Sequence, residues 1–126
     1  MTGEAPNAFE TALLESICRS NPAKAQGLAD RIPDLVVLSR ENSGAGSFTI
    51  FRLPGMDRGA ATARSTLGSN EEVGLPGLKF GLGMLAFLEQ GFLHILETYT
   101  YGEDWNGEWE GFRLLPKPTA PPPQEQ

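Results

Sequence analysis

The hydrophobic positions near the start of the chain recur with the period of an α-helix. Phe9, Leu13 and Ile17 follow one another every four residues, which places them on one face of a helix. Asn7 and Glu10 have the spacing of a capping box, in which each residue satisfies a free backbone amide of the first turn. The pattern therefore predicts a helix that begins just after Asn7 and ends near residue 21.

The segments that follow predict a short second helix and then a change to β-structure. Residues 22–29 begin with a proline, which suits the first turn of a helix. Residues 35–38 are a brief apolar run with two adjacent valines, and this composition favours a strand. A turn rich in Gly, Ser and Asn over 42–46 and a second apolar run over 47–53 complete a predicted hairpin.

The longest patterned stretch covers residues 78–113 and predicts a second, longer hairpin. Gln90 and Gly91 separate two apolar runs of similar length, which indicates a two-residue turn. In that register the residue numbers of each cross-strand pair sum to 181, and one face of the hairpin is nearly all apolar or aromatic. The paired positions of this face are Phe80/Tyr101, Leu82/Tyr99, Met84/Glu97, Ala86/Ile95 and Leu88/Leu93. We expect this face to pack against the helices.

These elements predict an α+β fold, with an N-terminal helix or helix pair packed on an antiparallel meander sheet of about four to six strands. Residues 7–115 are expected to form a single domain. A flexible N-terminus is predicted over 1–6 and a disordered, proline-rich tail over 116–126. Residues 55–77, rich in Gly, Ser, Thr and Ala, are predicted to be a mobile loop.

Charge and cysteine content restrict the class of partner and the compartment. The chain of 126 residues has a formal net charge of −6, which disfavours nucleic acid because phosphate binding needs a basic surface. No apolar run has the roughly 20 residues of a membrane span, so no membrane partner is expected. The lone Cys18 allows no internal disulfide and is typical of a reducing compartment, from which we expect a cytoplasmic protein.

The chain offers few residues for catalysis. His94 is the only histidine, and no sequence motif places it or Cys18 in a nucleophilic site. Neither the residue types nor their spacing predict a metal or cofactor site. Glu97 is the exception on the apolar hairpin face, and it is a candidate buried carboxylate that must be paired, protonated or hydrogen-bonded.

Aromatic and acidic residues gather immediately after this hairpin. They are Tyr99, Tyr101, Glu103, Asp104, Trp105, Glu108, Trp109 and Glu110. Aromatic anchors among carboxylates are typical of a binding site for a basic protein. Alternatively, the two tryptophans fold onto the core as a lid and leave the acids solvated.

The leading hypothesis is a small acidic, non-enzymatic protein-binding module, such as a toxin-immunity-type inhibitor or a regulator that binds a basic protein partner. One alternative is a small enzyme or ligand-binding domain with a pocket around Glu97 and Tyr99. Another is a structural accessory or oligomerising subunit that uses the apolar face of the sheet.

Overall fold

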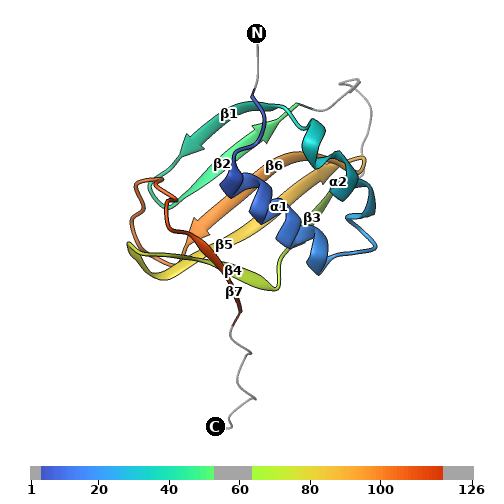
Figure 1. Cartoon of the computed structure of the whole chain (residues 1–126). Helices are drawn as coiled ribbons and strands as arrows, with labels where there is room; N and C mark the ends of the chain where they lie inside the picture. Colours follow the sequence, from blue (N-terminus) through green and yellow to red (C-terminus); the bar gives the residue numbers. More distant parts are fainter. Residues whose placement is uncertain (1–3, 53–63, 118–126) are drawn as a thin grey trace, which may run out of the picture.

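A computed structural model describes residues 4–52 and 64–117. Two helices, α1 (Ala8–Ser20) and α2 (Gln26–Arg31), lie on one face of a seven-stranded antiparallel sheet (Figure 1). A short 3₁₀ helix, η1 (Ile32–Asp34), leads from α2 into the sheet. The strands are β1 (Val37–Asn42), β2 (Gly46–Phe51), β3 (Arg64–Gly68), β4 (Glu71–Leu75), β5 (Leu78–Glu89), β6 (Phe92–Thr100) and β7 (Arg113–Pro116). The predicted α+β fold is confirmed.

The predicted capping box starts α1. The Asn7 side chain accepts a hydrogen bond from the Glu10 amide at 2.8 Å, and the Glu10 carboxylate accepts one from the Asn7 amide at 2.9 Å. These two bonds satisfy amides that have no partner within the helix. The second helix begins later than expected, at Gln26 instead of residue 22, because the intervening residues form turns.

The sheet has the order β1-β2-β6-β5-β4-β7, and β3 also pairs with β5. β3 and β4 therefore share one edge of β5, while β6 takes the other. The prediction of a mobile loop over 55–77 is wrong for residues 64–75, which form β3 and β4; residues 55–63 of that prediction lie outside the described residues. The first three residues of β3 are exposed and polar. The strand therefore lacks the alternation of apolar and polar residues by which the sequence could have predicted it.

Both ends of the described chain are attached to the sheet. Glu4, in the segment predicted to be flexible, exchanges two backbone hydrogen bonds with Val37 of β1, at 2.7 and 3.3 Å. At the other end, Pro116 belongs to β7, and the Lys117 amide donates to the Asn70 carbonyl at 3.0 Å. The rest of the predicted tail, residues 118–126, lies outside the described residues.

The core lies between α1 and the sheet. Leu13, Leu14 and Ile17 have no solvent exposure, and they belong to the same buried cluster as Leu82 and Ala86 of β5. Burying each such aliphatic side chain contributes about 1.5–3 kcal/mol. The apolar residues on one side of α1 and those on one face of β5 thus pack together in a single layer.

In the long hairpin the predicted turn is confirmed, but the predicted pairing register is wrong beyond the first two residue pairs. Glu89 pairs with Phe92 across Gln90 and Gly91, as expected. The register then shifts by one, because His94 is an extra residue on β6 and makes a β-bulge. Beyond it Glu97 pairs with Leu85 of β5, where the sequence had predicted Met84.

A shift of one residue exchanges the two faces of a strand. Leu82, Met84 and Leu88 of β5 face the helices as predicted, and they are almost fully buried. On β6, by contrast, the residues beyond the bulge that were expected to face the helices point to the opposite side, while Leu96 and Thr98 are buried instead. The prediction that Glu97 belongs to the helix-facing layer is therefore wrong.

Candidate protein-binding surfaces

The β6–β7 connection carries the tryptophans that the sequence singled out, and it uses both of them to close the core. Trp105 is only 7% exposed, and its indole nitrogen donates to the Glu108 carbonyl at 3.0 Å. Trp109 is half-buried and stacks on Phe9 of α1, with ring centroids 5.6 Å apart and an interplanar angle of 9°. The lid alternative thus describes both tryptophans better than exposed anchors do.

The same connection is fixed to the sheet at its start. The Glu103 carboxylate accepts hydrogen bonds from the amides of Lys79 and Phe80 at 2.8 and 2.7 Å. The Trp105 amide donates to the Gly44 carbonyl, in the β1–β2 turn, at 2.8 Å. Glu103 is therefore a structural residue, and its bonds hold the loop in one position.

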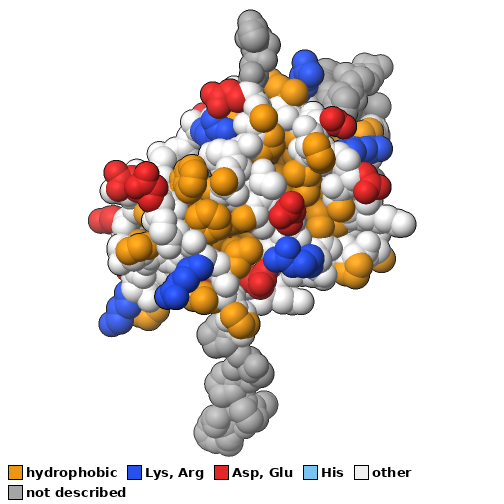
Figure 2. All heavy atoms as spheres, viewed as in Figure 1, with side chains coloured by type: hydrophobic (Ala, Val, Ile, Leu, Met, Phe, Trp, Pro, Cys, Tyr) orange, Lys and Arg blue, Asp and Glu red, His pale blue; other side chains and the backbone are white. Residues whose placement is uncertain are grey.

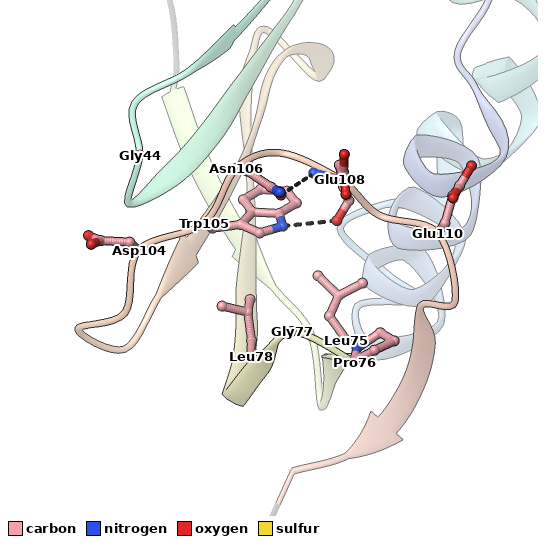
Figure 3. A pocket seen from close by; sticks show the side chains of 10 residues that line it. All are labelled: Gly44, Leu75, Pro76, Gly77, Leu78, Asp104, Trp105, Asn106, Glu108 and Glu110. Carbon is pink, nitrogen blue, oxygen red and sulfur yellow. Dashed lines mark hydrogen bonds between the residues drawn. The ribbon is translucent and has the colours of Figure 1, made fainter.

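The remaining acids surround a cavity of about 540 Å³ (Figure 3). Leu75, Pro76, Leu78 and Trp105 give the cavity an apolar wall. We call the exposed carboxylates around it the acidic rim, which consists of Asp104, Glu108 and Glu110. In Figure 3 all three carboxylates project outward from the wall. Within the described residues, none of them has an ion-pair partner.

The rim belongs to the side of the molecule that carries the helices. Figure 2 shows a group of acidic side chains at the left edge, where Figure 1 places the β6–β7 connection and the β1–β2 turn. Elsewhere on this side, acidic and basic groups alternate. Several carboxylates are thus gathered at one end of the sheet, with basic side chains above and below them in this view.

The two tyrosines of the predicted cluster lie apart from the tryptophans, on the face of the sheet opposite the helices. Their rings meet edge to face, with centroids 5.6 Å apart, and the Tyr101 hydroxyl lies 3.2 Å from a Glu72 carboxylate oxygen, to which it donates. The Tyr99 ring lies directly over Gly83, where a Cβ atom would clash with it. The structure therefore divides the predicted cluster into two surfaces.

Glu97 lies on this second face and is half-buried. It accepts no hydrogen bond and forms no ion pair within the described part of the chain. Burial raises the pKa of the Glu97 carboxyl above its ordinary value. Neither Glu97 nor Tyr99 lines any of the four clearest cavities of the described residues.

The carboxylate that is buried in this fold is Glu10, which is 3% exposed. Arg40 of β1 donates to it through Nε at 2.6 Å, and Thr49 of β2 donates at 3.1 Å. The hydrogen bond to Glu10 is the main reason that the pKa of Arg40 is raised. The capping spacing identified Glu10 as a helix-start residue, but no sequence signal indicated that its other oxygen meets an arginine 30 residues away.

The residues considered for catalysis do not come together. His94 lies 3.5 Å from a Glu89 carboxylate oxygen at the end of the hairpin, whereas Cys18 is a buried residue of α1. Burial raises the pKa of the Cys18 thiol, which disfavours the reactive thiolate. Among residues 4–52 and 64–117, no three His, Cys, Asp or Glu side chains are grouped as metal ligands.

Neither helix in the described part of the chain has the length and apolar character to span a membrane. No protein-family model, no curated protein and no solved structure matches the chain. Function must therefore be argued from the surfaces themselves.

Proposed function

We propose that the chain is a non-enzymatic protein-binding module, and that it binds a basic protein partner through the acidic rim. A toxin-immunity-type inhibitor, which covers a site on its target, is a concrete form of this function. The observation that carries the proposal is the rim itself: Asp104, Glu108 and Glu110 are exposed, have no ion-pair partner among the described residues and surround a cavity that has one apolar wall.

The chemistry of the rim suits lysine and arginine side chains. Each has an apolar stem and a charged head, so its stem can lie against Pro76, which is exposed, while its head meets a carboxylate. The bonds of Glu103 hold the loop in place before binding, which reduces the entropy lost on association. Clustered negative charge also speeds encounter with a basic surface.

A non-enzymatic role is supported by the separation of the reactive residues. His94 and Cys18 lie in different layers, and the thiol has a raised pKa. A ligand-binding role for Glu97 and Tyr99 has less support, because neither lines one of the clearest cavities.

The test is capture of partners from native lysate by the full chain and by two charge-matched triple variants. The rim variant is Asp104→Asn, Glu108→Gln, Glu110→Gln. The control variant removes three exposed acids of the helical region, Glu15→Gln, Asp30→Asn, Asp34→Asn. We expect a basic protein to be retained by wild type and control and lost by the rim variant. Equal retention by all three, or no retained protein, would contradict the proposal.

A further inference from the structure

The face of the sheet opposite the helices is apolar at its centre. Pairing aligns Phe48, Glu97 and Leu85 in one row across β2, β6 and β5, and aligns Ile50, Ile95 and Phe87 in the next. We call these six residues, together with Tyr99, the open face. All seven are half-buried, while their neighbours in sequence Thr49, Phe51, Leu96 and Ala86 are buried on the helix side.

No described helix covers the open face, because α1 and α2 both pack on the other side of the sheet (Figure 1). Contiguous apolar side chains without a covering layer are typical of a contact surface. At their centre lies Glu97, whose carboxylate has no partner among the described residues. Any apolar surface that covered it without a cation would bury an unpaired charge, which is costly.

The charge of Glu97 distinguishes two possible partners for the open face, a second copy of the chain and a protein that carries a Lys or Arg side chain. A second copy of the chain, docked face to face about a two-fold axis, would bury two Glu97 carboxylates in one apolar interface. Glu41 of β1, paired with Phe48, would add further negative charge from each copy. A surface with a lysine or arginine at the matching position meets no such penalty.

We propose that the open face is a docking surface for a protein segment that places one Lys or Arg side chain opposite Glu97, between apolar side chains. The aromatic and aliphatic residues around Glu97 supply the contact area, and Glu97 selects the cation. Arginine suits this position well, because its planar head pairs with a carboxylate and stacks on rings such as Phe48. This docking surface is separate from the acidic rim, and neither depends on the other.

A phage-displayed library of random 12-residue peptides, selected on the immobilised full chain, supplies defined probes. We expect enriched peptides to carry Arg or Lys between apolar residues. Their affinity should fall at least tenfold for Glu97→Gln, an isosteric change that removes only the charge. It should stay within twofold for the triple variant of the acidic rim, which separates this test from that of the proposed function.

Methyl NMR spectra of the full chain locate the bound peptide independently of any variant. We expect resonances of Ile50, Ile95 and Leu85 to shift on addition of an enriched peptide, and those of Leu13 and Ile17 on the buried side of α1 to stay in place. Four results would overturn the inference: no enrichment, enrichment without a cation, unchanged affinity for Glu97→Gln, or shifts confined to the helix side.

Discussion

At the scale of single residues, two carboxylates have opposite surroundings. Glu10 is buried and meets Arg40, Thr49 and the start of α1. Glu97 is half-buried among apolar side chains and meets no described donor. Glu10 therefore stabilises the fold, whereas Glu97 lowers its stability. A bound cation opposite Glu97 would remove that penalty.

Glu10→Ala should lower the free energy of unfolding by about 2–3 kcal/mol, because it leaves the capping amide without its acceptor and leaves Arg40 only the exposed Glu4 carboxylate and the Ala5 carbonyl as acceptors. We place the loss below the full value for a buried pair, since the Arg40 side chain is 34% exposed. Chemical denaturation measures it, with Glu15→Ala, exposed on the same helix, as the control. A loss no larger than that of the control would show that the Glu10 contacts contribute little.

Glu97→Gln should raise the free energy of unfolding slightly, by about 0.5 kcal/mol or less. The pKa of Glu97 is raised in the folded state, so the folded chain binds more protons here than the unfolded chain. Wild type should thus lose stability as pH rises from the ordinary glutamate pKa through the raised value. Denaturation curves of both proteins across this range measure the difference, which should grow with pH and then level off. A difference that shrinks with rising pH would contradict this account.

At the scale of elements, the sequence predicted what local patterns encode. The helix period and the capping box located the start of α1, and Gln90-Gly91 located the turn of the long hairpin. The bulge at His94 could not be predicted, because one extra residue changes no local pattern but exchanges the faces of every residue beyond it. For that reason the sequence alone predicts that Glu97 faces the helices.

The β6–β7 connection is a second place where local sequence patterns could not predict the structure. Composition alone identified the segment, and it includes the acidic rim. Whether Trp105 was an anchor for a partner or part of the core depended on contacts with Phe9 and Gly44, which are far away in the sequence. An irregular segment has no repeating hydrophobic pattern, so the sequence could not predict these long-range contacts.

Trp105→Ala should destabilise the chain by about 3–5 kcal/mol, the cost of removing a buried aromatic side chain. Asp104→Ala, the neighbouring substitution on the exposed rim, should change stability by about 0.5 kcal/mol or less. Thermal or chemical unfolding of both variants makes the comparison. Similar small effects at the two positions would mean that the loop does not close the core.

At the scale of the whole molecule, the two candidate contact surfaces occupy separate places. The acidic rim lies at one end of the sheet, and the open face lies on the side away from the helices. The chain has a net charge of −6, which favours basic partners for both surfaces and repels further copies of the chain.

Glu97→Leu should make the chain self-associate, because it removes the charge that keeps the open face from stacking on a second copy. Sedimentation velocity at increasing concentration should show a dimer for this variant and a monomer for wild type. Glu15→Leu, which adds an apolar residue on the helix side, is the matched control. A wild-type dimer, or a monomeric Glu97→Leu chain, would contradict the role given to this charge.

The most direct test of the central claim is the affinity of a captured basic partner for wild type, the rim variant and the charge-matched helix variant at two salt concentrations. We predict that the rim variant binds at least tenfold more weakly, that the helix variant binds within twofold of wild type, and that salt weakens wild-type binding more than that of the rim variant. Equal affinities for the rim and helix variants would contradict it.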